Sequence, residues 1–263
     1  MLEAGLLGGL AILVYVCSIW LLSLAVRNAS IIDIFWGPGF LLASIVYLLA
    51  SPDGYAGRQV LVVALVAVWS LRLGAHIFVR NAGQGEDFRY QKWRESAPET
   101  FWWRSLFQVF LLQGLLCWTI SMPLLVAIYS DEPSNLTPWD YLGLATWMVG
   151  FGFEAIGDYQ LMAFKSDPDS RGRVMDRGLW RYTRHPNYFG EATLWWGYFL
   201  IAVSVPWGWL TGFSPTLMTF LLVRVSGAAL LERGLKKRRP EYEDYIRRTS
   251  GFIPWAPKQE ETS

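Results

Sequence analysis

The chain has 263 residues, of which 53% are hydrophobic and only 17% are charged, and its formal net charge is +1. A soluble protein with so many long apolar stretches would have too little polar surface to cover them, so the composition argues against an ordinary soluble domain. Cys17 and Cys117 both lie inside apolar stretches, and they indicate neither a disulfide framework nor a thiolate metal site.

Seven apolar runs follow one another along the chain, and each is close to the roughly 20 residues that cross a bilayer core. They cover residues 6–26, 31–50, 59–79, 106–129, 139–164, 188–205 and 213–231. No internal repeat or Gly/Ser linker divides them. The sequence therefore predicts one all-α integral membrane domain over 1–263 with seven transmembrane helices.

The lysines and arginines orient these helices. They gather in the connections after the third, fifth and seventh runs, whereas SDEPSNLTP and PWGWLTGFSP, after the fourth and sixth runs, contain none. Basic connections favour the cytoplasmic side of a membrane. The pattern predicts an N-terminus outside the cell and a cytoplasmic C-terminus.

Polar residues inside the first three runs are candidates for function, because they are costly in lipid. Asp33 begins the second run in SIIDIFWGPGF, where it could be a helix N-cap or a functional acid. In the third run, Trp69, Arg72, His76 and Arg80 are spaced i, i+3, i+7 and i+11 and form one helical stripe. Such a stripe must face protein, water or a charged ligand.

The fifth run repeats this pattern with Glu154, Asp158 and Lys165. These residues either form a salt-bridge ladder with the bases of the third run or contact a ligand. In the sixth run, YTRHPNYFGE places a helix start at Pro186, because proline fits the first helical turn. Asn187 and Glu191 then lie one turn apart on one face.

Bases cluster just before that start: Arg173, Arg177, Arg181, Arg184 and His185. The positive end of a helix dipole together with arginines suits a phosphate or diphosphate. A basic belt for anionic lipid heads is the alternative, but it leaves Asn187 and Glu191 unexplained. The chain has no GxGxxG after a strand and no GxxxxGK[ST], so a nucleotide would need another kind of site.

The segments DRGLWRYTRHPNYFGEATLWWGYFL and RPEYEDYIRRTSGFIPW resemble the C-terminal domain of the steroid 5-alpha reductase family, specifically its bacterial branch. IIDIFWGPGF and WSLRLGAHIFVRNAGQGEDFRY also resemble that branch, so the similarity covers most of the chain. NYFGEATLWWGYFL is its most specific part. The shorter RHPNY is also similar to a motif of isoprenylcysteine carboxyl methyltransferases, which use S-adenosylmethionine.

The resemblance implies a seven-helix membrane reductase that takes NADPH from the cytosolic side and reduces a carbon-carbon double bond conjugated to a ketone. Residues 1–105 would then form the substrate side, 106–256 would bind the cofactor, and 257–263 would be a disordered tail. Asp33 lies where animal members carry a catalytic glutamate, and Trp69 lies near their catalytic tyrosine. RGLKKRRPEY has no histidine, where animal members have several.

The resemblance also implies a set of cofactor-binding residues. Asn187 and Glu191 would contact the nicotinamide end, and Tyr245 matches a tyrosine of the C-terminal motif. The full set is Arg72, Asp158, Lys165, Arg173, Tyr182, Arg184, His185, Asn187, Glu191 and Tyr245.

The chemistry indicates why Asp33 is the expected catalytic acid. Hydride addition to an enone builds negative charge on the ketone oxygen, which needs a hydrogen-bond donor in a dry site. A carboxyl group can donate only while it is protonated, which apolar surroundings favour. Ile32, Ile34, Phe35 and Trp36 flank Asp33, and the ring of Trp69 or Trp36 could line a flat substrate.

Two other classes of protein remain open. One is a membrane methyltransferase that binds S-adenosylmethionine, and the other is a transporter or lipid-binding protein, although no repeat of half-helices is evident. The expected partners are a lipophilic, steroid-like enone and membrane lipids, with neither a nucleic acid nor a metal. The expected location is a bacterial inner membrane, crossed several times.

Overall fold

The computed structural model describes residues 1–225 and 241–258, and these residues form helices and no β-strand. The end of the seventh predicted run, most of RGLKKRRPEY and residues 259–263 of the predicted disordered tail lie outside the described residues. The chain divides into two compact units. The first unit is Met1–Asp140 with Ala202–Thr211, and the second is Tyr141–Ile201 with Gly212–Ser263.

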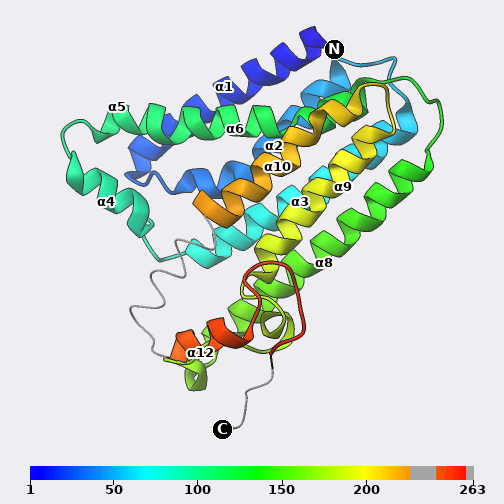
Figure 1. The fold of residues 1–263 in the computed structure, drawn as a ribbon. Coiled ribbons are helices and arrows are strands. Elements are labelled where there is room, and N and C mark those ends of the chain that lie inside the picture. Colours follow the sequence, from blue (N-terminus) through cyan, green and yellow to red (C-terminus); the bar gives the residue numbers. More distant parts are fainter. Residues whose placement is uncertain (226–240, 259–263) are drawn as a thin grey trace. The chain divides into compact units, whose positions relative to one another are not determined.

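The first unit is built around α2, which contacts both α1 and α3 and is also contacted by α6 and α7 (Figure 1). Its elements are α1 (Leu2–Val26), α2 (Ile31–Leu49), α3 (Ala56–Asn81), α4 (Phe88–Ser96), α5 (Phe101–Ser105), a π-helical segment (Leu106–Leu111), α6 (Leu112–Ile120), α7 (Met122–Tyr129) and a 3-10 turn (Gly208–Gly212).

A tight turn joins α1 to α2. Arg27 ends α1 with a left-handed backbone, φ 54°, and the N–H of Asn28 returns to the carbonyl of Ser23 at 3.0 Å. These bonds satisfy carbonyls that a helix end would otherwise leave open. The Asn28 side chain then accepts hydrogen bonds from the backbone and hydroxyl of Ser30, the residue before α2. The start of α2 is thereby fixed.

Glycines allow α2 and α3 to approach closely. A Cβ atom on Gly37 would lie 3.0 Å from the carbonyl oxygen of Ser70, and one on Gly74 would lie 3.2 Å from that of Ile34. Pro38 lies inside α2 and cannot donate to Ile34, four residues earlier. Close backbone contact through small residues is a common way for apolar helices to associate.

The fourth predicted run is a bent helix rather than a straight one. Phe101–Ile120 and Met122–Tyr129 are inclined by 41° at a break around Ser121. Pro123, in the first turn of α7, explains the break, because a proline lacks the N–H that would continue the preceding helix. Tyr47 on α2 and Ser121 share a 2.8 Å hydrogen bond between their hydroxyls.

A fully buried ion pair closes the first unit around the start of α3. Arg58 Nε lies 2.9 Å from Asp140 Oδ1, and neither side chain is exposed. The same carboxylate accepts hydrogen bonds from Thr137 and Ser204. This many partners compensate the loss of hydration of a buried charge.

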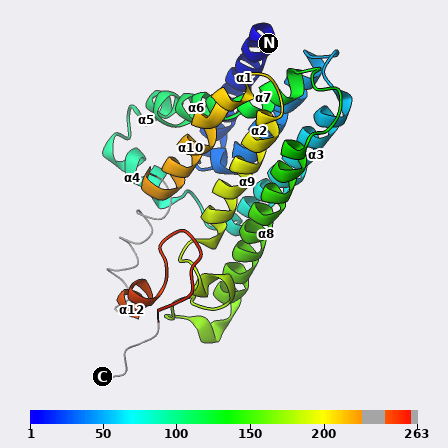
Figure 2. The same cartoon turned by 45° about the vertical axis from the view of Figure 1, so that its right-hand side comes forward.

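The second unit contains the longest helix of the described residues, α8 (Pro138–Ser166), from Tyr141 onward. Figure 1 and Figure 2 show α8 running side by side with α9. Its other elements are the 3-10 turns Pro168–Ser170 and Gly178–Arg181, then α9 (Pro186–Val203), α10 (Phe213–Phe220), a π-helical segment (Leu221–Val225) and α12 (Glu241–Arg248).

Glycines spaced by seven residues hold α8 against α9. They are Gly143, Gly150 and Gly157 on α8, and Gly190 and Gly197 on α9. A Cβ on Gly150 would lie 2.4 Å from the backbone nitrogen of Leu194, and one on Gly190 would lie 2.3 Å from that of Glu154. No side chain fits at such distances, so the two helices touch backbone to backbone.

Each predicted apolar run contains a helix as far as the structure describes it, whereas α4 and α12 lie outside the runs. Several helices are apolar enough to make this a membrane protein. Among the described residues, α1, α2 and α3 have the length and composition to cross a membrane, and the bent pair from Phe101 to Tyr129 makes a fourth if it counts as one span. Helices α8 and α9 occupy the fifth and sixth runs but do not reach that apolar content. The predicted number of seven spans and their orientation stay predictions.

Candidate functional site

In the first unit, the carboxylate of Asp33 is the centre of a polar cluster. It accepts one hydrogen bond from Arg89 Nη2 at 2.9 Å and another from the hydroxyl of Tyr90 at 2.7 Å. The side chain of Asp33 is 17% exposed. Ser30, and not Asp33, occupies the N-cap of α2. The carboxylate therefore binds the segment after α3 rather than capping its own helix.

This segment is held in place by further carboxylates. Asp87 begins α4 by accepting from the backbone N–H of Arg89, and it also accepts from Arg89 Nε, both at 2.9 Å. Burial alone would raise the pKa of Asp87, but these hydrogen bonds from Arg89 outweigh it and lower the pKa. Glu86 accepts from Ala29 N at 2.6 Å and pairs with Arg94.

Arg89 therefore stays charged between two carboxylates. Burial would lower the pKa of its guanidinium, but the hydrogen bond to Asp87 and the charge of Asp33 raise it further above its already high ordinary value. A cation at this point balances the negative charge of Asp33. The sequence predicted apolar neighbours for Asp33 but not this partner, because Arg89 comes from a distant part of the chain.

Tyr90 is a phenol held in its protonated form. Only 4% of the residue is exposed. Burial, followed by the charge of Asp33 and the hydrogen bond to it, raises the pKa of Tyr90 well above the ordinary value of about 10. Gln113 of α6 donates to the same hydroxyl at 3.3 Å. At neutral pH the phenol keeps its proton, which it donates to Asp33 in a largely dry site.

Trp69, the other predicted catalytic residue, is fully buried on α3. Its ring meets that of Phe40 on α2 edge to face, with centroids 5.6 Å apart, and Phe40 meets Trp36 at 5.2 Å. Arg72 lies one turn further along α3 and is half-buried. The predicted stripe does lie on one continuous helix.

In the second unit, α9 begins at Pro186, as the sequence predicted, with Asn187 and Glu191 one turn apart. Asn187 Nδ2 donates to Asp158 Oδ1 on α8 at 3.0 Å, and Asn187 Oδ1 accepts from the N–H of Tyr188 at 3.1 Å. Gly157 permits the contact, since a Cβ there would lie 3.2 Å from the Asn187 nitrogen. Two predicted cofactor residues from different helices thus meet directly.

Arg184 and Tyr245 bind other parts of the protein. Arg184 donates to the carbonyls of Ile246 and Thr249 at the end of α12, at 3.1 and 2.9 Å. The hydroxyl of Tyr245 donates to the carbonyl of Trp180. Burial, above all, raises the pKa of Tyr245, which keeps this donor protonated. Both side chains fasten α12 to the connection before α9.

The C-terminal segment, residues 249–258, continues this attachment. Thr183 donates to the carbonyl of Phe252 at 2.8 Å, and the N–H of Trp255 donates to the carbonyl of Tyr182 at 3.0 Å. The connection is anchored to α8 in turn, because the indole N–H of Trp180 donates to the carbonyl of Gly157 at 3.0 Å.

The remaining predicted residues differ in exposure. His185 is buried and stacks on Tyr188 with ring centroids 5.6 Å apart. Lys165, at the end of α8, and Arg173, in the following connection, are exposed. Tyr182 is 45% exposed. Lys165 and Arg173 are therefore accessible to a ligand, whereas His185 supports the start of α9.

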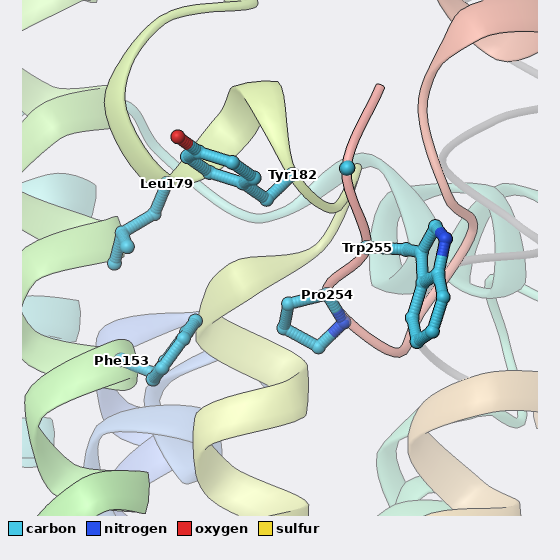
Figure 3. A pocket seen from close by; sticks show the side chains of 6 residues that line it. Phe153, Leu179, Tyr182, Pro254 and Trp255 are labelled. Carbon is cyan, nitrogen blue, oxygen red and sulfur yellow. The ribbon is translucent and has the colours of Figure 1, made fainter. Parts of the chain in front are cut away.

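An apolar pocket of about 550 Å³ lies beside this region of the second unit. Figure 3 shows Phe153 reaching into it from α8, and Pro254 and Trp255 forming a wall from the C-terminal segment. Leu179, Tyr182 and Ala256 complete the lining. Within the residues that the structure describes, no group of three or more His, Cys, Asp or Glu side chains could hold a metal ion.

Sequence reasoning missed Arg89 and Gln113, and it gave Tyr90 no primary role. Arg89 and Tyr90 are 56 and 57 residues from Asp33. The sequence indicated these partners only through QGEDFRY, a charged segment between two apolar runs. This segment follows α3 and is not part of the polar stripe on that helix. Gln113 is an amide within an apolar run, which is itself unusual.

Two known proteins are similar to this chain. The chain is 26% identical over 263 residues to an uncharacterized protein of Schizosaccharomyces pombe. This match covers 90% of this chain and 75% of the yeast protein. It is also 27% identical over 133 residues to the 3-oxo-5-alpha-steroid 4-dehydrogenase 1 of Bos taurus. That match covers 49% of this chain and 46% of the bovine protein. No solved structure matches significantly.

A family model matches most of the chain, from residue 19 to residue 249. Its description reads "Protein of unknown function (DUF1295)", and steroid 5-alpha reductase-like proteins are among its members. The chain belongs to this DUF1295 family.

Proposed function

We propose that the protein is a membrane oxidoreductase that uses NADPH to reduce a carbon-carbon double bond conjugated to a ketone in a lipophilic, steroid-like molecule. The observation that carries the proposal is the hydrogen bond between Tyr90 and Asp33, which holds a protonated phenol beside an ion pair. The similarity to the bovine steroid dehydrogenase supports the same class of reaction.

The first-unit cluster supplies what this reaction needs at the ketone. Negative charge develops on the ketone oxygen as the β carbon is reduced, and a preorganised donor stabilises that charge. The Tyr90 hydroxyl is the donor in our proposal: its one proton, which it donates to Asp33 in the free protein, turns to the ketone oxygen when the substrate binds. Asp33 orients the hydroxyl, and Arg89 compensates the charge of Asp33. The α carbon then receives a proton from solvent or a nearby acid.

The second-unit residues fit a nicotinamide cofactor in their chemistry. A primary amide has two N–H donors and two acceptor lone pairs. Asn187 uses one of each toward Asp158 and Tyr188, so one donor and one acceptor remain for a carboxamide. Glu191 would contact the same end, and Lys165 and Arg173 would contact phosphates. NADPH, when bound, supplies the hydride.

The number of membrane spans and their orientation are part of the proposal. Seven helices would cross a bacterial inner membrane, with the N-terminus outside and the basic connections in the cytoplasm. Arg184 and Tyr245 then act by holding the connection before α9, and Arg72 and His185 remain proposed cofactor contacts. Trp69 serves as a wall of the substrate site.

The test is thermal unfolding of the purified protein in detergent with NADPH, NADH or S-adenosylmethionine. A ligand that binds the folded state raises the apparent melting temperature by mass action. We expect stabilisation by NADPH above that by NADH, because arginines bind the extra phosphate. Stabilisation by S-adenosylmethionine alone would instead support a methyltransferase and overturn the proposal.

Asn187→Ala and Glu191→Ala sharpen the test. Loss of a hydrogen bond to a buried polar partner costs about 1–3 kcal/mol, so NADPH affinity should fall by roughly 5- to 150-fold. Asn135→Ala is the control, since Asn135 lies in an exposed connection of the first unit. Unchanged NADPH binding and turnover in both α9 variants would remove these residues from the site.

A further inference from the structure

The apolar pocket of the second unit does not belong to the polar pair that we assign to the cofactor. Phe153 and Asp158 are five residues apart on α8, which places them about 140° apart around the helix. Phe189 and Asn187 are two residues apart on α9 and point about 160° apart. Phe153 and Phe189 pack together with centroids 5.1 Å apart, so they mark the face away from Asn187.

The lining of the pocket suits a hydrocarbon chain. Phe153, Leu179, Pro254 and Ala256 offer no side-chain hydrogen bond, and the volume of about 550 Å³ lies within the usual range for small-molecule sites, roughly 300–1,000 Å³. A ligand with many polar atoms would leave them unsatisfied there. The pocket therefore selects an apolar group.

Two bases lie close to the lining residues along the chain. Arg177 is two residues before Leu179, Arg181 directly precedes Tyr182, and both arginines are exposed. Trp255 is 73% exposed. Exposed aromatic rings beside bases are typical of the boundary between a membrane and the cytoplasm, where anionic lipid heads lie.

We propose that this pocket binds an acyl chain of an anionic phospholipid, whose phosphate contacts Arg177 and Arg181. The bound lipid would cover the pocket wall formed by the C-terminal segment. Tyr182 then contributes its ring to the lipid site. This inference goes beyond the proposed reaction and does not depend on it.

The experiment is native mass spectrometry of the full chain in a mild detergent, after removal of copurified lipid. The protein is titrated with dioleoyl phosphatidylglycerol or with dioleoyl phosphatidylcholine, which have the same chains but different headgroup charge. We expect one tight site that prefers phosphatidylglycerol. Each arginine near an anionic surface contributes about fivefold in affinity. The double variant Arg177→Gln, Arg181→Gln should therefore bind phosphatidylglycerol about 25-fold more weakly.

Ala256→Trp fills the pocket from an exposed position, and it should remove the tight site for both lipids while the melting temperature stays near that of the wild type. Lys92→Gln, an exposed base of α4, is the control for loss of charge and should change nothing. Wild-type lipid binding by Ala256→Trp overturns the proposal. Displacement of the bound lipid by NADPH also overturns it, because the pocket would then belong to the cofactor.

Discussion

At the scale of single residues, our proposal assigns the donor to Tyr90, whereas the sequence predicted a protonated Asp33. Asp33 accepts hydrogen bonds from both Arg89 and Tyr90. In our proposal its role is to orient the phenol. The sequence predicted a role for this acid, but it could not show that Arg89 and Tyr90 would be its partners.

Tyr90→Phe should therefore reduce turnover strongly. Removal of one donor to a developing oxyanion typically costs about 10²- to 10³-fold in rate. NADPH binding should be nearly unchanged, because the variant leaves the second unit intact. The measurement is single-turnover NADPH oxidation with an enone substrate. Tyr141→Phe, which removes the hydroxyl of an exposed tyrosine on α8, is the matched control and should keep the wild-type rate.

The pH profile distinguishes the two possible donors. The pKa of Tyr90 is raised in the folded protein, so its phenol is fully protonated below the ordinary pKa of about 10 and contributes its full stability there. The proton and this stability are lost only as the pH rises through the pKa of Tyr90 in the folded protein. Titration of Tyr90 should thus leave the wild-type rate unchanged up to about pH 10. A decline through pH 6 to 8 that Asp33→Asn abolishes would return the role of donor to Asp33.

At the scale of the helices, the apolar runs predicted where the long helices lie, because a long apolar segment satisfies its backbone in a membrane by forming a helix. The short polar helices α4 and α12 lie outside the runs. The bend at Ser121 could not be predicted, since a single proline in an apolar run can either be accommodated or break the helix. The sequence also could not show that the glycines of α8 and α9 face one another. That contact depends on how two helices are rotated about their axes.

Gly150→Ala tests the contact between α8 and α9. Its Cβ would lie 2.4 Å from the nitrogen of Leu194, so the helices must separate, at a cost of about 1–3 kcal/mol. Gly152→Ala is the matched control, because no atom lies within 4 Å of a Cβ there. We expect a clear fall in melting temperature for Gly150→Ala only, measured by circular dichroism in detergent. Equal melting temperatures would mean that the two helices can separate without cost.

At the scale of the whole molecule, the proposed donor cluster belongs to the first unit and the proposed cofactor contacts belong mainly to the second. The predicted division of roles at residue 105 stays a prediction. Contacts that join distant segments could not be predicted. Arg184 illustrates this, since its sequence context indicated a phosphate while its guanidinium donates to carbonyls at the end of α12.

The reaction proposed for this member of the DUF1295 family is the reduction of an enone with NADPH. The most direct measurement is incubation of the purified protein with NADPH and a 3-keto-4-ene steroid such as progesterone, following loss of the enone and of NADPH together. We predict that both disappear in equal amounts and that a saturated ketone forms. Stabilisation by NADPH without loss of the enone in progesterone or other lipophilic enones would contradict the claim.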